Sequence, residues 1–235
     1  IASAGAILSA SIQEEIETLL PDVMIINSFG TSESGDLGRA AGDEDSHEGR
    51  PSFYMGDEVT VLDENGDQIK PGSGEIGMVA RSGRLPLGYY KDPVKTSERF
   101  KEFKGQRWVV PGDFATIEED GRITFLGRGS KCINTGGEKV FPEEVEEALK
   151  AHTEIIDALV VAVPDPRFGS KVAAVFNTRD NKQLSIEEVQ QHCRKHIAGY
   201  KVPRQITITE TVSRMPSGKP DYKWAEDIAR EQASA

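Results

Sequence analysis

Lys219 follows a Pro-Ser-Gly turn, and its ammonium group could act on a phosphate or on a developing oxyanion. Because glycine frees the backbone, such a turn can carry a lysine tip away from its own domain. A cation brought to a phosphate centre is a strong catalytic device. Taken alone, the motif equally describes an exposed loop lysine, so its meaning depends on the motifs that precede it.

The run from Phe29 to Glu33 combines an aromatic ring, a glycine, two hydroxyl groups and a carboxylate. A purine can stack on Phe29, and Gly30 lets a ligand approach the backbone closely. The hydroxyl groups can donate to phosphate oxygens, and the Glu33 carboxylate can hold Mg²⁺ beside them. The alternative is a polar turn after a strand, which this run alone would favour.

Asp113 and Arg128 offer a second pair of polar groups. Asp113 follows a Pro-Gly dipeptide, and its carboxylate could accept both hydroxyl groups of a ribose. Arg128 could reach the same sugar or a phosphate. In isolation, a turn aspartate and a surface arginine are the simpler interpretation.

Two later runs could contact a phosphate-bearing ligand with a thin arm. Gly136 and Gly137 have no side chains, which suits a narrow passage as well as a plain tight turn. Lys201 could bind a phosphate with Arg204 beside it, although a lysine lying along the surface is the plainer alternative.

The four histidines do not form a metal-binding pattern. His192 and His196 are four residues apart, but no cysteine or acidic partner is clearly placed beside them. A solvent-facing helix is therefore favoured over a zinc site.

Composition narrows the class of protein. The 235 residues are 37% hydrophobic and 29% charged, as in ordinary globular proteins. A net charge of −11 argues against a nucleic-acid-binding surface. Two cysteines fit a reducing compartment, and the sequence contains neither a signal peptide nor an apolar run of about 18 residues. We therefore predict a cytoplasmic protein and leave peripheral membrane contact open.

The elements that must position these groups divide the sequence in two. The first part begins with a predicted helix over residues 12–20, where apolar residues share one face behind a capping serine. A short buried strand is predicted over residues 23–26, with residues 27–35 as a loop at its carboxyl end. Such loops are where α/β folds place ligands.

A second pattern runs from residue 49 to residue 127. Short β-prone runs alternate there with turn signals, which predicts a small antiparallel, barrel-like sheet. Asn65-Gly66 and Asp120-Gly121 are the hairpin signals, and residues 92–103 are predicted to be a helical interruption.

After Arg128 the pattern changes to α+β, with residues 127–130 as the candidate linker. Pro142 opens a helix rich in early glutamates, and Ser185 with Glu188 predicts a capped helix. The remaining predicted elements are strands at 158–163 (ended by Pro164), 172–176 and 205–209, and a last helix at 223–231. The fold class is mixed α/β.

In this order, the motifs resemble those of the adenylate-forming superfamily, and in particular its AMP-forming acyl-CoA synthetases. The resemblance runs from Ser3 to Lys219. It implies that residues 1–128 are the C-terminal part of a large N-terminal domain with a β-barrel subdomain, and that residues 129–235 are a mobile C-terminal domain. Such enzymes use ATP to convert a carboxylic acid to an acyl-adenylate, and the CoA thiol then displaces AMP.

The resemblance also implies roles for individual residues. Lys219, Ser32 and Glu33 would be catalytic, with Glu33 holding Mg²⁺ and Lys219 serving the adenylation step. Contacts with ATP or AMP would come from Ser3, Gly5, Ala6, Ser28, Phe29, Gly30, Thr31, Ser32, Asp113, Arg128, Ser130, Lys139 and Lys219. Contacts with CoA would come from Gly136, Gly137, Lys201 and Arg204.

Three departures from the family pattern stand out. Phe29 and Ser32 replace a usual Tyr and Thr, and both exchanges keep the ring and the hydroxyl group. Ser130 occupies the hinge position, where Asp or Lys is usual. The Ser/Thr/Gly-rich phosphate loop is absent, and the sequence opens on Ile1 without Met, so we expect a C-terminal piece that is inactive alone.

Three functions remain open at this stage. The first is an acyl-CoA synthetase for a long-chain or bulky ring-bearing acid, with ATP, Mg²⁺ and CoA. The second is an acyl-AMP ligase that loads a carrier protein, although its usual inserted segment is not evident near residues 82–90. The third is a non-catalytic nucleotide-binding module.

Overall fold

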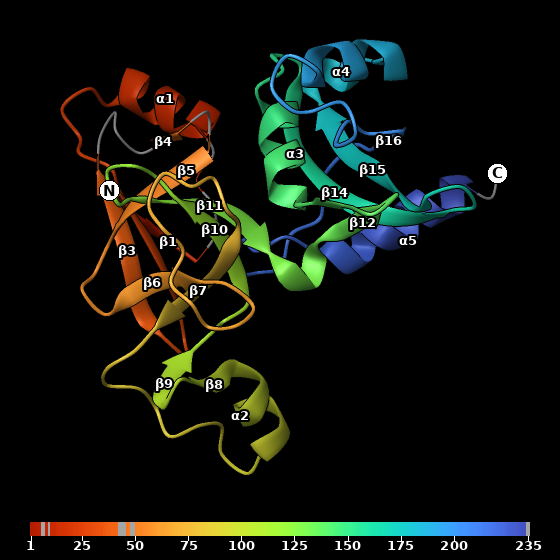
Figure 1. The fold of residues 1–235 in the computed structure, drawn as a ribbon. Coiled ribbons are helices and arrows are strands. Elements are labelled where there is room, and N and C mark those ends of the chain that lie inside the picture. Colours follow the sequence, from red (N-terminus) through yellow and green to blue (C-terminus); the bar gives the residue numbers. More distant parts are fainter. Residues whose placement is uncertain (6–7, 9, 42–45, 48–49, 234–235) are drawn as a thin grey trace. The chain divides into compact units, whose positions relative to one another are not determined.

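The computed structural model describes residues 1–5, 8, 10–41, 46–47 and 50–233. Its internal contacts divide the chain into two compact units, whose boundary along the chain falls between Ser130 and Lys131. Nearly all of the first unit precedes this boundary and nearly all of the second follows it. Each unit is described by itself (Figure 1).

The first unit is built on one large sheet, and eleven strands of the described part of the chain belong to it. Its main path runs β1-β2-β3-β5-β11-β10-β7-β9-β8, with β4 on β5 and β6 on β7. The β1–β2 pair is parallel and the others are antiparallel. The strands are β1 (Ala2–Ala4), β2 (Ile26–Thr31), β3 (Gly35–Ala41), β4 (Ser46–His47), β5 (Arg50–Met55), β6 (Val59–Leu62), β7 (Gly77–Arg81), β8 (Phe100–Phe103), β9 (Gln106–Val109), β10 (Asp113–Ile117) and β11 (Ile123–Arg128).

The core of this unit lies on the central strands. Val61, Val79, Ala115 and Ile123 are fully buried and pack in one cluster with Phe53 and Phe125. Antiparallel pairing between residues 50 and 128 confirms the predicted sheet, whereas its closure into a barrel stays a prediction. The predicted Asp120-Gly121 turn joins β10 to β11, as expected from the positive φ of Gly121 (85°).

Two predictions in the first unit need correction. Residues 23–26 are not a buried strand, because Met24 is 68% exposed and β2 begins only at Ile26. The predicted loop at 27–35 is therefore mostly the β2–β3 hairpin. The composition of this segment is polar, as in a loop. Its backbone groups find hydrogen-bond partners because β2 pairs with β1 and β3.

The helical interruption is shorter than predicted. α1 (Ala10–Leu19) confirms the predicted helix but begins before Ser11, so the predicted serine cap is wrong. α2 covers only Pro93–Arg99, with Asp92 accepting a hydrogen bond from the Lys95 N–H at 2.9 Å. Residues 100–103 are strand β8, paired with β9. The two residues between them, Lys104 and Gly105, have φ values of 52° and 76°, which is the geometry of a tight hairpin turn.

The second unit is a three-stranded sheet with helices on both faces, and a separate two-stranded ribbon. The sheet order is β14-β15-β16, where β14–β15 is antiparallel and β15–β16 is parallel. The elements are η2 (Gly129–Lys131) at the boundary, β12 (Ile133–Thr135), β13 (Glu138–Val140), α3 (Pro142–Lys150), β14 (Ile155–Asp165), β15 (Gly169–Thr178), η3 (Arg179–Asn181), α4 (Ile186–Cys193), β16 (Gln205–Ile208) and α5 (Tyr222–Ala233).

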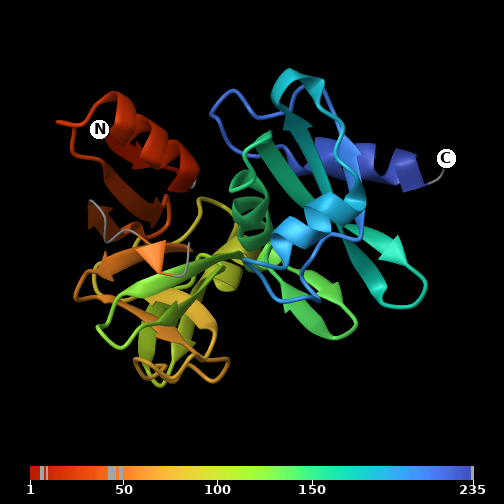
Figure 2. The same ribbon diagram turned by 90° about the horizontal axis from the view of Figure 1, so that it is seen from above.

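Alternation along the strands explains the two covered faces. Val160, Ala174 and Phe176 pack with residues of α3 and α4, whereas Val161 and Val175 pack with residues of α5. Because successive side chains of a strand point to opposite faces, nearly continuous apolar runs are required here. The helices α3 and α4 lie on one side of the sheet and α5 (blue) lies on the other (Figure 1, Figure 2).

Most predicted elements of the second unit are confirmed, although β14 and β15 extend beyond the predicted strands at both ends. Pro142 opens α3, and Ser185 and Glu188 form the predicted capping box, with the Glu188 N–H 3.2 Å from Ser185 Oγ. Pro164 does not end its strand, because β14 continues to Asp165. β14 lies at the edge of this sheet, where a missing N–H costs no ladder hydrogen bond.

Among the described residues, no helix has the length and apolar character needed to cross a membrane.

Candidate functional site

The β2–β3 hairpin carries the predicted nucleotide residues from Phe29 to Glu33. Phe29, Gly30 and Thr31 lie in β2, and Ser32 and Glu33 lie in the turn. Gly30 faces Gly35 so closely that a Cβ atom would lie 2.3 Å from the Gly35 carbonyl oxygen. Any other residue would force the strands apart, so this glycine shapes the turn that presents Ser32 and Glu33.

Phe29 is half-buried among other aromatic rings. Its ring centroid lies 5.5 Å from that of Phe53 and 5.1 Å from that of Phe125. Part of the ring thus belongs to the core of the first unit, which fixes its orientation. Its stacking on adenine stays a prediction that depends on the part left exposed.

Glu33 has a partner that sequence reasoning missed. The Tyr89 hydroxyl donates a short hydrogen bond to Glu33 Oε1, and this bond is the main cause that lowers the pKa of Glu33. Lys95 lies over the Tyr89 ring, with Nζ 4.1 Å from the centroid, and also favours the ionised carboxylate. The only signal in the sequence was a tyrosine after a glycine, which is too weak to single out.

Glu33 offers a metal ion one ionised carboxylate as a ligand. Among the described residues, no group of three or more His, Cys, Asp or Glu side chains is arranged to hold a metal ion. Mg²⁺ commonly binds through one or two carboxylates together with phosphates of the substrate. An ionised Glu33 therefore fits Mg²⁺ that arrives with a nucleotide.

Asp113 and Arg128, far apart in the sequence, lie side by side because β10 and β11 pair. Arg128 Nε donates to Asp113 Oδ1 at 3.0 Å. The Asp113 side chain is only 2% exposed, and its Oδ2 atom has no hydrogen-bond partner within the described structure. Burial raises the pKa of Asp113, and the Arg128 charge opposes that rise. A buried acceptor without a donor is a suitable partner for a ligand hydroxyl group.

The predicted N-terminal contacts lie beside the same hairpin. β1 pairs with β2 in parallel, which places Ser3 opposite Asn27 and Ala4 opposite Ser28. Gly5 has a φ of 85°, so the chain turns there directly after β1. Ala6 lies outside the described residues.

Gly136 and Gly137 form the turn between β12 and β13, with φ values of 60° and 92°. Both values favour glycine, so the turn explains the pair whether or not a ligand passes. The Gly136 N–H donates to the Phe168 carbonyl oxygen at 3.0 Å, and the Arg204 guanidinium lies 4.2 Å from the Phe168 ring centroid. Phe168, which the sequence did not single out, thus contacts two residues predicted to bind CoA.

Lys201 already has a partner within the second unit. Its ammonium group forms a 2.7 Å ion pair with Glu144, and the two side chains are 16% and 3% exposed. Its contact with CoA stays a prediction. Binding a phosphate would require it to leave Glu144, so Arg204 is the better-placed cation of the two.

The remaining predicted residues are exposed. Ser130 lies in η2 at the boundary of the units, Lys139 lies on β13, and Lys219 lies on the turn that precedes α5. Within the described ranges, no hydrogen bond or ion pair joins the Lys219 ammonium group to another residue.

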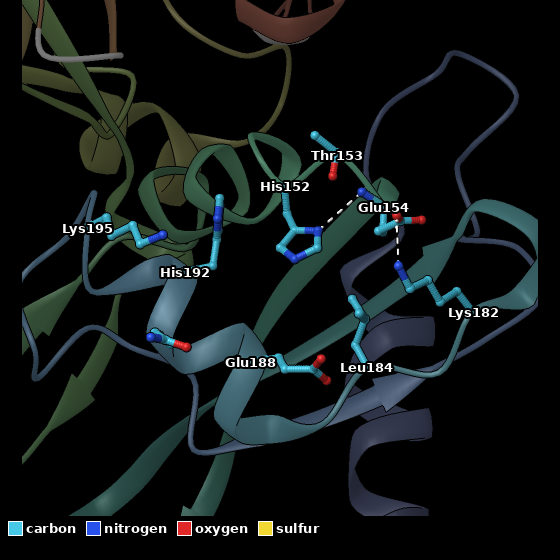
Figure 3. A pocket seen from close by; sticks show the side chains of 9 residues that line it. His152, Thr153, Glu154, Lys182, Leu184, Glu188, His192 and Lys195 are labelled. Carbon is cyan, nitrogen blue, oxygen red and sulfur yellow. Dashed lines mark hydrogen bonds and ion pairs between the residues drawn. The ribbon is translucent and has the colours of Figure 1, made fainter.

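A hollow of about 310 Å³ lies elsewhere in the second unit and contains none of the predicted residues. Its lining includes His152, Glu154, Lys182, Glu188 and His192 (Figure 3). His192 is half-buried and within hydrogen-bonding distance of the Ala148 carbonyl oxygen (2.9 Å), so this side chain of the predicted solvent-facing helix is partly covered. Burial lowers the pKa of His192.

Residues 144–219 match the model of a known family, the AMP-binding enzyme C-terminal domain. The match covers these residues alone, which are fewer than half of the chain. The matched segment contains Lys201, Arg204 and Lys219, and it lies entirely within the second unit.

Curated relatives extend the similarity beyond the AMP-binding enzyme C-terminal domain. A medium/long-chain-fatty-acid–CoA/3-oxocholest-4-en-26-oate–CoA ligase of Mycolicibacterium smegmatis is 48% identical over 233 residues, covering 99% of this chain and 42% of that protein. A 3-oxocholest-4-en-26-oate–CoA ligase of Rhodococcus rhodochrous is 50% identical over 234 residues, covering 97% and 41%. The chain thus spans less than half the length of these relatives.

A solved structure shows the same fold. ATP-bound MatB from Rhodopseudomonas palustris matches with a TM-score of 0.81 and 25% identity, over 96% of this chain and 44% of that one. The mixed α/β fold of adenylate-forming enzymes is therefore confirmed, as is the resemblance on which the sequence prediction rested.

Proposed function

We propose that this chain is part of an AMP-forming acyl-CoA synthetase. The observation that carries the proposal is the Asp113 carboxylate, which is buried, holds Arg128 with one oxygen and leaves the other without a protein partner. A ribose supplies the hydroxyl donor that this oxygen lacks. The named activity of the relatives, at about half identity over almost all of this chain, supports the same conclusion.

The proposed reaction has two steps. In the first, a carboxylate oxygen of the acid attacks the α-phosphorus of ATP, and the bond to pyrophosphate breaks. In the second, the CoA sulfur attacks the acyl carbon, AMP leaves, and the thiol proton passes to solvent. Mg²⁺ would neutralise phosphate charge while bound to the nucleotide.

The chain's own residues would divide this work. Asp113 and Arg128 would hold the ribose, Phe29 would pack on adenine, and Ser32 would donate to a phosphate oxygen. Glu33, ionised and oriented by Tyr89, would hold Mg²⁺. Lys219 would stabilise the charge that develops as the acid attacks the α-phosphate.

The second step would use the turn at Gly136 and Gly137. A pantetheine arm is thin, and a turn without side chains leaves it room. Arg204, stacked on Phe168 next to this turn, is the cation we propose for a CoA phosphate.

We propose a medium- or long-chain fatty acid, or a steroid with an acidic side chain, as the substrate. The relatives carry these acids in their names. The polypeptide that contains this chain would act on the acid in the cytoplasm.

ATP–pyrophosphate exchange by the polypeptide that contains this chain tests the proposal. The acids offered would be a medium-chain fatty acid, a long-chain fatty acid and 3-oxocholest-4-en-26-oate, each with and without Mg²⁺. Exchange with at least one acid, followed by CoA thioester formation, is the expected result. Exchange without transfer to CoA, but with transfer to a carrier protein, would favour an acyl-AMP ligase, and nucleotide binding without exchange would favour a non-catalytic module.

A further inference from the structure

The turn that bears Lys219 is a small hairpin with its own backbone hydrogen bonds. The Met215 N–H donates to the Lys219 carbonyl oxygen at 2.9 Å, and the Gly218 N–H donates to the Met215 carbonyl oxygen at 2.8 Å. Arg214 and Pro220 form an isolated antiparallel bridge at its base. Exposed turns of this size are normally mobile unless other contacts hold them.

Arg214 supplies such contacts at the base of the hairpin. Its Nε atom lies 2.7 Å from Asp157 Oδ2 and its Nη2 atom lies 2.6 Å from Asp157 Oδ1, which is a bidentate ion pair. Its third nitrogen, Nη1, donates to the carbonyl oxygen of Gly218 at 3.2 Å. One guanidinium group thus joins the sheet to the residue directly before Lys219.

Asp157 is itself fixed to the sheet. Its N–H donates to Asn177 Oδ1 at 3.1 Å, and its Oδ1 atom accepts from the Ala158 N–H at 2.9 Å. It lies at an irregularity in the β14–β15 pairing. The Arg214 side chain is 33% exposed and that of Asp157 is 23% exposed, so solvent screens this pair less than a surface pair.

The chain after Lys219 is held as well. Asp221 accepts a hydrogen bond from the Trp224 N–H at 3.1 Å at the start of α5, and Ser213 Oγ lies 3.4 Å from Asp221 Oδ2. Both ends of the hairpin are therefore tied to the framework, while the Lys219 side chain, on the second arm of the hairpin opposite Met215, is exposed.

We propose that Arg214 and Asp157 are positioning residues for Lys219. Their ion pair fixes the hairpin to β14, so that the lysine is presented with little loss of backbone freedom when it meets its target. The inference rests on the proposed function, because it concerns the step that Lys219 serves. Arginine suits this place because its planar fork can pair with the carboxylate and still reach a carbonyl oxygen.

The two steps of the proposed reaction separate positioning from simple stability. Lys219 serves acid activation, whereas thioester formation from a supplied acyl-adenylate and CoA does not use it under the proposed roles. Loss of the ion pair should therefore slow ATP–pyrophosphate exchange and leave thioester formation unchanged. A purely structural ion pair would affect both steps together.

The experiment compares Arg214→Gln and Asp157→Asn with Lys182→Gln in the polypeptide that contains this chain. The last variant removes another ion pair of the same unit, Lys182 with Glu154 at 2.8 Å, and is the matched control. We expect each clamp variant to lower kcat for exchange by about 10- to 100-fold, with KM for ATP and thioester formation changed by less than about twofold. The control should change neither step.

Arg214→Lys completes the set of variants, and thermal unfolding of each variant checks that it is folded. Lysine keeps the charge but cannot make the bidentate pair and the Gly218 contact together, so its rate should fall between those of wild type and Arg214→Gln. Equal losses in both steps, or no loss in exchange, would overturn the inference. If the wild type itself exchanges no pyrophosphate with any acid, the proposed function fails, which is a different result from unchanged exchange in the variants.

Discussion

The two units hold their proposed functional groups in opposite ways. In the first unit, Asp113 is buried on a strand and paired with Arg128, and Glu33 is held by Tyr89. In the second unit, Lys219 is exposed on a turn, and the contacts lie at the base of the turn rather than at the lysine. The groups that we propose to hold a ligand are fixed directly, whereas the lysine that we propose to serve one step is fixed through its backbone.

Lys219→Ala should have the largest effect and tests the second half of this comparison. Removing a cation that stabilises charge in the transition state should lower ATP–pyrophosphate exchange by about 10²- to 10³-fold. Thioester formation from a supplied acyl-adenylate should be unchanged. Lys223→Ala, an exposed lysine at the start of α5, is the control and should leave both steps intact. Unchanged exchange in Lys219→Ala would remove this lysine from the adenylation step.

Asp113→Asn tests the first half. The amide keeps the size but loses the charge-assisted acceptor, so KM for ATP should rise by about 10- to 100-fold. Steady-state kinetics with varied ATP measures this. Asp120→Asn, on the exposed turn between the same two strands, is the control and should leave KM for ATP unchanged. If KM for ATP stays constant in Asp113→Asn, this carboxylate does not hold the nucleotide.

Stability should respond to Asp113→Asn in the opposite direction. Burial raises the pKa of Asp113, so its contribution to stability is full below its unfolded pKa and is lost as pH rises through the folded pKa. Above its folded pKa the ionised group therefore costs stability, and the asparagine variant should unfold at the same temperature or higher. Thermal unfolding at pH 7 measures this, and a markedly lower Tm would show that the ion pair with Arg128 outweighs the cost of burial.

Tyr89→Phe should have a smaller effect on the same side of the comparison. The Tyr89 hydroxyl lowers the pKa of Glu33, whose ionised form is lost as pH falls through that pKa. Without the hydroxyl, the acid limb of the pH–rate profile should move to higher pH, and KM for Mg²⁺ should rise by about two- to tenfold. Tyr90→Phe, at an exposed neighbour, is the control. An unmoved acid limb would mean that Tyr89 does not tune Glu33.

Glu146→Gln should have the smallest effect on activity and probes a buried carboxylate of the second unit. Burial raises the pKa of Glu146 to about 8, although it accepts a 2.9 Å hydrogen bond from the Val160 N–H. Its stabilising contribution is full below the unfolded pKa of 4.5 and is lost as pH rises through about 8. Between pH 5 and 8, calorimetry should show that Tm falls less steeply with rising pH in the variant than in the wild type. An unchanged slope would contradict the pKa shift.

The sequence predicted the second unit better than the first. Long apolar runs and a capping box at Ser185 depend on local chemistry, so β14, β15 and α4 were located, although both strands extend beyond their predicted ends. The β2–β3 hairpin was mistaken for a loop, because its strands are polar and are stabilised by pairing with distant partners. The same reason hid β8 behind a helical pattern.

For the candidate site, the sequence by itself determined which residue types are present and in what order, and that order was enough to predict the family. Tertiary structure alone decided their partners. It brought Arg128 into contact with Asp113, Tyr89 with Glu33 and Glu144 with Lys201. It also anchored the Lys219 hairpin through Arg214. Motif order is written along the chain, but burial and pairing depend on residues tens of positions apart, which only the folded backbone brings together.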